Sequence, residues 1–484
     1  MKIILLLLAL AAAAQAQTPT DPHESNFGAD FRTERRHVSE ACGTFSSKSA
    51  GGCAIELFTD HPFHIAAGSI APQNGFGVGG AVVTHYTPTN WRMSFDLDAV
   101  GSSNASWRAG AYLKMVHTPK EKSGPEPAKP DDLAKPGQPA PKHIIIKVAA
   151  PHPYTVFNLY AQAISLNQLN FFGLGPDSTI AGKSLFGMTQ TIVGVSAIKP
   201  VYEFKSIRGL NLSLIGQANA RFVSIRSRNG QSAPSIETVY SEATAPGLTN
   251  QPGFLQLEEG LRLKPALFHD NLQFNYLAKF DEFFAPSNSQ YNFQRWTLDL
   301  NHTIPLYTKS QSYAFKDAKG PDDCTDATAS KDTPCPPVSY SWNRQGSINF
   351  RFFLSESMNS SSAAVPFYFQ QTLGGSDVNG APALSSFQDY RFRAPNLMLF
   401  RESFEHSIWG PFGLQFLADQ GKVAVTRRDI GFDHLKHSFS AGLTLRAGGF
   451  PQVSLLYAWG GESSHTIGAL NTSLLGGSGR PPLD

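Results

Sequence analysis

Apolar and polar residues alternate along much of this chain. In residues 91–98 every second residue is apolar, at Trp91, Met93, Phe95 and Leu97. The same period of two recurs in residues 210–222, 272–280 and 295–304. Alternation of this kind predicts β-strands with one apolar and one polar face. Several runs exceed the roughly five or six residues usual in soluble sheets and reach the ~10 residues of a tilted membrane strand.

The whole pattern predicts an all-β fold, a transmembrane antiparallel β-barrel of about 16 strands. The predicted strands are 75–86, 91–100, 106–117, 142–150, 155–171, 189–202, 209–225, 254–264, 271–284, 291–307, 341–354, 396–407, 412–423, 438–447, 452–461 and 465–475. An even count puts both chain ends on the periplasmic side. The outer side then receives the connections 117–142, 171–189, 225–254 and 355–395, and the long connection 308–340 falls on the periplasmic side. A missed hairpin would change the count to about fourteen or eighteen.

Alternation does not show which face meets lipid, because a soluble sandwich alternates too. Strand length favours the membrane barrel. So do the aromatic residues near strand ends, where an interfacial girdle is expected: Tyr86, Trp91, Trp107, Trp296, Tyr307, Trp342, Trp409 and Trp459.

Composition argues against a cytosolic enzyme and a helical membrane protein. Only 16% of the 484 residues are charged, against roughly 25% in a soluble domain, yet there are 35 Phe and 42 Gly. The net charge of +2 gives no reason to expect nucleic acid as a partner. Beyond the first residues, no apolar stretch reaches the ~18 residues of a spanning helix.

The first sixteen residues have the pattern of a secretory signal peptide. Met1-Lys2 precedes the apolar run Ile3 to Ala14, and Ala14-Gln15-Ala16 offers a cleavage site. The run is too short for a transmembrane anchor. We expect export to a Gram-negative-type outer membrane, with 17–70 as a short periplasmic segment or a plug, 71–475 as the barrel and 476–484 as a tail.

Four cysteines, Cys42, Cys53, Cys324 and Cys335, form an even set, which in an exported chain indicates disulfides. Three connectivities are possible, and the two sequence-local pairs are favoured. Residues 118–142 are rich in Pro and Lys and are predicted to be a disordered surface loop.

From Tyr368 onward the chain resembles the bacterial surface-antigen superfamily, the barrel-assembly and translocation factors of outer membranes. The motifs, in order, are Leu373-Gly374-Gly375, Leu384 to Phe387, Asp389 to Arg393, Glu402 to Glu405 and Phe416 to Val423, with Asn170 to Gly175 upstream. The resemblance is dense over 370–475 and patchy from about 75. It implies a sixteen-stranded barrel whose long sixth outer loop folds into the lumen.

Two departures from the family matter. Its Arg-Gly pair is replaced by Ser385-Ser386, so Arg391 or Arg393 is the candidate to pair with Asp419 and hold the loop. The alternative is that Arg391 and Arg393 lie at the solvated base of the loop and pair with no carboxylate. We name Asp389, Tyr390, Arg391, Arg393 and Asp419 as candidate lumen-loop and gating residues. Residues 17–70 are also too short for the family's periplasmic POTRA domains, and the chain ends in Pro481-Pro482-Leu483-Asp484 rather than on an aromatic residue.

No catalytic or metal motif stands out. Ser341-Trp342-Asn343-Arg344 is similar to a fragment of outer-membrane phospholipase A but lacks the His-x-Ser run that supplies base and nucleophile. Asp60 to His64 fits no standard ligand set. We therefore expect no enzyme activity, no cofactor and no metal. Outer-membrane lipid is the expected partner, and the expected role is insertion or translocation of a polypeptide or lipid, with a passive or loop-gated solute channel and a structural surface protein as alternatives.

Overall fold

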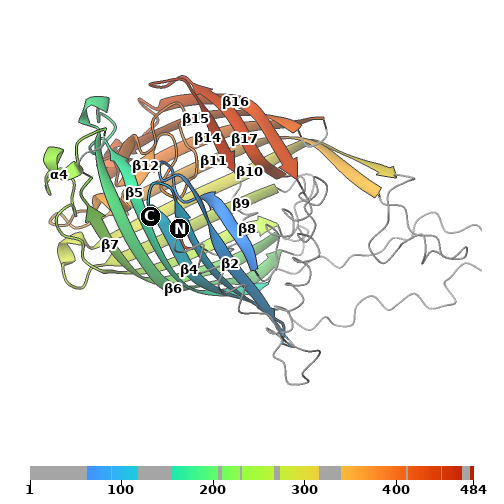
Figure 1. Cartoon of the computed structure of the whole chain (residues 1–484), viewed down its shortest axis with the longest axis horizontal. Helices are drawn as coiled ribbons and strands as arrows, with labels where there is room; N and C mark the ends of the chain where they lie inside the picture. The colour runs from blue at the N-terminus through green and yellow to red at the C-terminus, as the bar shows by residue number, and fades with distance from the viewer. Residues whose placement is uncertain are drawn as a thin grey trace, which may run out of the picture.

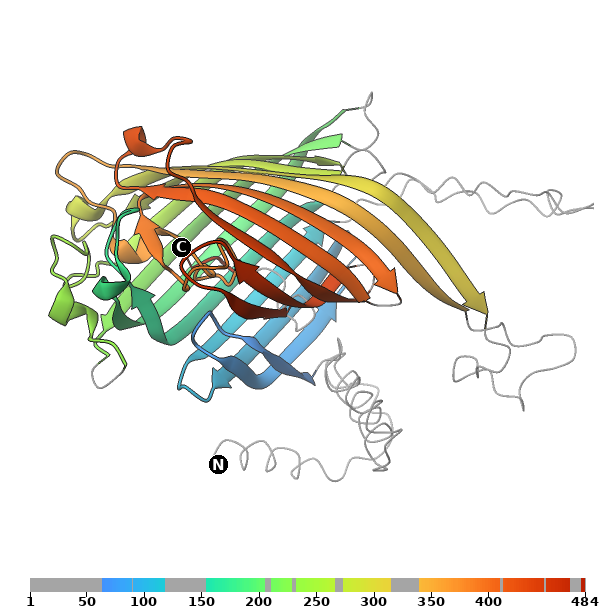
Figure 2. The same ribbon diagram turned by 90° about the horizontal axis from the view of Figure 1, so that it is seen from above.

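The computed structural model describes residues 63–88, 90–117, 154–204, 210–228, 232–265, 273–314, 339–409, 412–447, 450–470 and 480–483. They form one 16-stranded sheet and one two-stranded sheet. Every pairing in the large sheet is antiparallel, and the sheet curls into a barrel (Figures 1 and 2). β1 and β18 are its two edge strands, and no pairing joins them within the described ranges.

The strands follow chain order around the barrel. They are β1 Phe63–Ser69, β2 Phe76–Tyr86, β3 Trp91–Ser102, β4 Trp107–His117, β5 Thr155–Phe171, β6 Ser184–Phe204, β7 Leu210–Arg226, β8 Phe254–Pro265, β9 Gln273–Phe284, β10 Phe293–Ala314, β11 Ser339–Met358, β14 Asn396–Trp409, β15 Phe412–Ala424, β16 Lys436–Ala447, β17 Phe450–Trp459 and β18 His465–Leu470. β12 Gln371–Leu373 and β13 Phe392–Ala394 make the small sheet. Within the described residues, one short α-helix, α4 Ile236–Val239, lies between β7 and β8.

The two faces of the barrel are inverted relative to a soluble sandwich. Large apolar side chains are exposed on the outside, among them Leu97, Leu159, Val195, Leu257, Phe416 and Leu455. Polar and charged side chains alternate with them and are buried inside, among them Asp98, Gln162, Asn219, Gln256, Asp281 and Asp419. An apolar exterior around a polar interior is the arrangement that a lipid environment requires.

The predicted total of sixteen strands is confirmed, but the set of strands differs from the prediction. β4 pairs directly with β5, from Trp107↔Ser165 to His117↔Thr155, so the sheet has no place between them for the predicted strand 142–150, whose residues lie outside the described ranges. In its place the sheet has β1, which lies inside the segment 17–70 that was expected to precede the barrel. The sheet therefore begins at Phe63 rather than at residue 71.

The extra predicted strand also placed one connection at the wrong end. With β1 counted, the β4–β5 connection leaves the same end as the β10–β11 connection. The connections β5–β6, β7–β8 and β11–β14 leave the opposite end, where both views show packed loops (Figures 1 and 2). The 117–142 connection thus does not belong on the outer side with the other long loops.

Several predictions fall on residues that the structure does not describe: the signal peptide, the four cysteines and the Pro-rich segment 118–142. Among the described residues, none of the helices has the length and apolar character needed to cross a membrane.

Candidate functional site

The connection between β11 and β14, residues 359–395, folds into the barrel and is called the lumen loop here. Its β12 and β13 pair with each other, from Gln371↔Ala394 to Leu373↔Phe392. β12 and β13 are buried throughout. β12 contacts β14 and β15, and a Cβ on Gly421, which shares the inner face of β15 with Asp419, would lie 3.0 Å from the Leu373 side chain. The lumen loop therefore packs on the inner face of the barrel wall.

Two glycines explain how the loop turns so tightly. Gly374 and Gly375 have φ of +107° and +65°, in the region that favours glycine. A Cβ on Gly374 would lie 2.6 Å from the Cβ of Arg391, and one on Gly375 would lie 2.5 Å from the backbone nitrogen of Asp389. The Leu-Gly-Gly motif is therefore needed because the backbone of residues 388–391 lies directly against it.

Arg391 connects three segments at the loop-covered end. Its guanidinium lies 2.7 Å from a carboxylate oxygen of Glu462, in the β17–β18 turn. It also donates to the Ser178 hydroxyl at 2.9 Å and to the Ser178 carbonyl at 2.7 Å, in the β5–β6 connection. The centre of the guanidinium lies 5.0 Å from the ring centroid of Phe172. Since the Arg391 side chain is only 3% exposed, loss of this pairing leaves a costly buried charge.

Arg393 is held mainly by a backbone carbonyl and by aromatic rings. It donates to the Phe367 carbonyl at 2.7 Å and lies about 6 Å from the rings of Phe171, Phe186 and Phe367. Its own carbonyl accepts from the Gly175 nitrogen at 2.8 Å. The loop strand β13 is thus tied to the upstream Asn170–Gly175 motif.

Asp419 joins the barrel wall to the loop, but its partner is not the predicted one. It forms a two-pronged ion pair with Arg401 at 2.7 and 2.9 Å, and accepts from the Leu384 nitrogen of the loop at 2.9 Å. Arg401 and Asp419 are direct neighbours on β14 and β15, and Arg401 also donates to the loop carbonyl of Pro382. Arg401 was not among the residues predicted from the sequence. The register of β14 on β15 is the signal that would have identified it.

The Ser385-Ser386 pair, which stands where the superfamily that the sequence resembles has Arg-Gly, is buried against the last strands. The Ser386 nitrogen donates to the Ser438 hydroxyl of β16 at 2.9 Å. The Ser386 carbonyl accepts from the Ser463 nitrogen at 3.1 Å. Short polar side chains here let the loop approach β16 and the β17–β18 turn closely.

Within the loop Tyr390 is buried and Asp389 is partly buried. Burial raises the pKa of Asp389, although its carboxylate accepts from the Ser376 nitrogen at 3.0 Å. Tyr390 has a φ of 60° and donates its hydroxyl to the Pro72 carbonyl at 3.0 Å. Burial raises the pKa of Tyr390 well above its ordinary value, so the phenol stays protonated and remains a donor. The structure thus brings the loop against the β1–β2 turn as well.

An aromatic layer fixes the start of the loop. Phe367, Tyr368 and Phe369 are buried, and Phe367 and Phe369 lie edge-on to rings of the barrel wall. Phe367 contacts Phe171 and Phe186 at centroid distances of 5.3 and 5.1 Å, and Phe369 contacts Phe254 at 5.0 Å. Aromatic pairs of this kind contribute about 0.5–1.5 kcal/mol each beyond their buried area.

The β7–β8 connection is ordered around one carboxylate, Glu242. It accepts from the Thr249 nitrogen at 2.8 Å, from the Tyr291 hydroxyl at 2.5 Å and from the Gly247 nitrogen. Burial alone would raise the pKa of Glu242, but these hydrogen bonds outweigh it and hold the pKa below its usual value. The carboxylate is therefore ionised at neutral pH and organises this end of the barrel.

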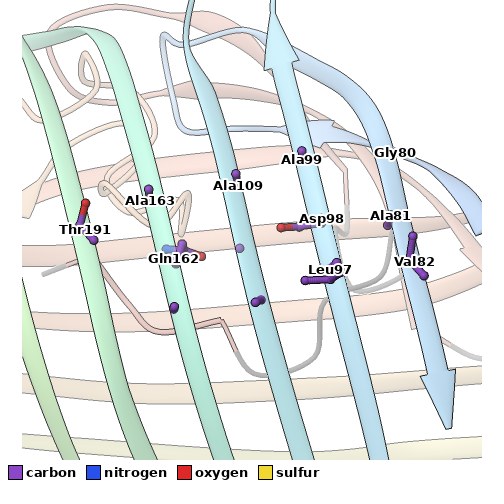
Figure 3. A pocket seen from close by; sticks show the side chains of 13 residues that line it. Gly80, Ala81, Val82, Leu97, Asp98, Ala99, Ala109, Gln162, Ala163 and Thr191 are labelled. Carbon is purple, nitrogen blue, oxygen red and sulfur yellow. The ribbon is translucent and has the colours of Figure 1, made fainter. Parts of the chain in front are cut away.

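The outer wall carries one hollow, of about 530 Å³, across β2 to β6. Figure 3 shows Ala99, Ala109, Ala163 and Thr191 in a row across β3 to β6. Small side chains on the apolar face make the wall locally thin. In the part of the chain that the structure describes, no group of three or more His, Cys, Asp or Glu side chains is placed to hold a metal ion.

These features define a class: a transmembrane antiparallel β-barrel with a long loop inserted in its lumen. No protein-family model and no curated protein matches the sequence. Among solved structures, the chain is similar to BamA from Haemophilus ducreyi lacking POTRA domains 1–3, at TM-score 0.43 and 10% identity, covering 90% of this chain and 81% of that one.

Two further solved structures are similar. CdiB from Escherichia coli has TM-score 0.44 and 10% identity, covering 82% of this chain and 58% of that chain. The copper transporter OprC has TM-score 0.32 and 9% identity, covering 79% of this chain and 57% of that chain. With TM-scores below 0.5, these likenesses do not tell what this chain binds or moves.

Proposed function

We propose that this protein is an outer-membrane barrel that inserts or translocates a polypeptide or lipid, and that its working part is the wall between β1 and β18. One contrast supports this: the lumen loop is firmly held, whereas within the described residues the two edge strands are the shortest of the large sheet.

The lumen route is obstructed at the loop-covered end. The lumen loop is held by the ion pair between Arg391 and Glu462. It is also held by two hydrogen bonds from its backbone, one from the Leu384 nitrogen to the Asp419 carboxylate and one from the Ser386 nitrogen to the Ser438 hydroxyl. Phe367, Tyr368, Phe369 and Tyr390 of the loop belong to the largest buried apolar cluster of the described chain. A polypeptide passing through the lumen would have to displace all of these contacts together.

The edge strands offer less resistance. β1 has 7 residues and β18 has 6, whereas β10 and β11 have 22 and 20. Fewer ladder hydrogen bonds hold a short strand to its neighbour, so strand separation costs least there. Edge strands also present unpaired backbone groups to which an incoming strand can add.

The test compares two glycines on the outer face that have equally open surroundings. A Cβ on Gly468 of β18 meets nothing within 4 Å, and one on Gly216 of β7 meets only a carbonyl at 4.0 Å. Valine at either site stabilises its strand by about 0.5–1 kcal/mol. In liposomes, an unfolded eight-stranded outer-membrane protein diluted from urea should fold faster with this protein than without it, as read from gel mobility. We expect Gly468→Val to slow this folding and Gly216→Val to leave it unchanged. No acceleration, or equal slowing by both variants, would contradict the proposal.

A second function, a loop-gated solute channel, is favoured by the polar lumen wall. A cavity of about 190 Å³ remains between the lumen loop and side chains such as Lys279, Asp281 and Arg351. If conductance rises when the loop is released while barrel folding is not accelerated, the channel is the better description.

A further inference from the structure

The C-terminal residues Arg480 to Leu483 lie inside the barrel. Figure 2 marks the chain end within the curl of the sheet, beside the lumen loop. Pro481 and Leu483 are buried, and Arg480 and Pro482 are partly buried. Residues this close to a chain end are usually exposed unless specific contacts hold them.

The first contact is an ion pair on the inner face of β3. The Arg480 guanidinium lies 2.5 Å from a carboxylate oxygen of Asp98, whose side chain is 5% exposed. Arg108 of β4 lies 3.5 Å from the same oxygen. Asp98 is therefore shared by two cations, and the nearer one belongs to the tail.

The second contact holds the backbone of Leu483 on both sides. Its nitrogen donates to the side-chain oxygen of Asn379, in the lumen loop, at 2.8 Å. Its carbonyl accepts from the Gln190 amide of β6 at 3.0 Å. The Leu483 side chain belongs to the same buried apolar cluster as Tyr390 and Phe367. Both backbone groups of one residue and its side chain are thus recognised.

The intervening prolines suit a bound, extended segment. Pro481 and Pro482 have no N–H to satisfy and restrict the backbone, so little conformational entropy is lost on binding. Pro482 lines the 190 Å³ cavity together with Asp377 and Arg295.

We propose that the lumen contains a peptide-binding site and that the chain's own C-terminus occupies it as an intramolecular ligand. The recognised chemistry is an extended peptide with a cation that binds Asp98, followed three residues later by an aliphatic residue bound between Gln190 and Asn379. This goes beyond the proposed insertion role, since it concerns the lumen and not the wall between β1 and β18.

The test uses a peptide supplied in trans. A fluorescent peptide of sequence Gly-Arg-Pro-Pro-Leu-Asp, matching 479–484, is titrated in detergent against the full chain and against a variant lacking 480–484. The tethered tail competes at an effective concentration on the order of millimolar, so anisotropy should show at least about tenfold tighter binding to the shortened variant. Equal or absent binding to both would overturn the proposal.

Two controls keep the result specific. A peptide with Asp in place of Arg should bind the shortened variant at least about tenfold more weakly, because it places a carboxylate against Asp98. Full-length Arg480→Asp should admit the unchanged peptide even if the shortened variant does not fold. Binding that is indifferent to both charge changes would also overturn the proposal. Because anisotropy needs neither conductance nor client folding, failure here and failure of the proposed function are separate results.

Discussion

Arg391 is the residue through which the lumen loop is tied to two other segments, the β5–β6 connection and the β17–β18 turn. It also lines a hollow of about 690 Å³ that opens at the loop-covered end, so water can enter when the pair is lost. The effect of removing this one side chain therefore reports directly on whether the loop closes the lumen.

For Arg391→Ala we expect higher single-channel conductance in planar bilayers and a loop destabilised by up to about 3 kcal/mol. That value is the low end for a buried pair, because Glu462 is 24% exposed. Arg427→Ala, which removes an exposed ion pair with Glu356, is the matched control and should leave conductance unchanged. Identical conductance in wild type and Arg391→Ala would remove the gating role.

A methyl group on Gly374 tests the loop geometry. Gly374→Ala introduces a Cβ 2.6 Å from Arg391, and we expect destabilisation by about 1–3 kcal/mol together with faster proteolysis of the loop. Gly380→Ala is the control, since Gly380 has a similarly positive φ of +86° with nothing within 4 Å. Equal effects of the two substitutions would show that backbone strain alone, and not close packing against Arg391, determines the outcome.

At the residue scale the sequence identified the loop and its buried side chains but not their partners. The motif order located Arg391, Arg393 and Asp419 in the chain, and all three are buried in the structure. The pairing of Asp419 with Arg401 depends on which residues face each other across β14 and β15, and alternation does not specify register.

At the scale of elements, the connections at the loop-covered end form one packed layer. Ala364 of the lumen loop donates to the Gln290 carbonyl of the β9–β10 connection at 2.9 Å. Phe367 donates to the Pro246 carbonyl of the β7–β8 connection at 2.7 Å. The order of the layer therefore depends on Glu242, which organises the β7–β8 connection.

The lowered pKa of Glu242 gives this layer a pH dependence. Because the pKa of Glu242 is lower in the folded state than in the unfolded state, its ionised form stabilises the folded layer at pH values above the ordinary glutamate pKa of about 4.3. This stabilisation is lost as the pH falls through the folded-state pKa. We expect hydrogen exchange in residues 241–253, corrected for intrinsic rate, to speed up below about pH 4. Glu242→Gln should exchange faster at neutral pH and lose this dependence. A pH-independent wild type would contradict the assignment.

The predicted order of strands was wrong where the β-propensity of a segment does not match its pairing with neighbouring strands. Residues 142–150 contain Ile144-Ile145-Ile146 and have high β-propensity, yet β4 pairs directly with β5. β1 is rich in small residues and shows no clear alternation, and its strand conformation depends on pairing with β2. Propensity is a weak guide when pairing between strands decides the outcome.

At the scale of the whole molecule, the apolar outer face is the feature that separates a membrane barrel from a soluble one. Leu257 of β8 is 49% exposed on that face. In lipid, Leu257→Arg should destabilise the barrel by up to ~2–4 kcal/mol, falling towards zero near the interface, whereas on a water-exposed surface it would cost almost nothing. Urea unfolding in lipid vesicles measures the difference, with Leu257→Met as control. No loss of stability for Leu257→Arg would mean that this face does not meet hydrocarbon.

The overall architecture was predictable because the period of two recurs along much of the chain, whereas topology was predictable only in part. One added and one missed strand left the total unchanged but reversed the side assigned to the β4–β5 connection. A correct number of strands is therefore weaker evidence for a correct topology than a correct order of neighbouring strands.

The position of Leu483 has a consequence for how the molecule is completed. Its binding groups come from β6 and from the lumen loop, and those of Arg480 come from β3, so the tail cannot dock until distant parts of the barrel have met. Docking of residues 480–483 therefore requires that β3, β6 and the lumen loop have already come together.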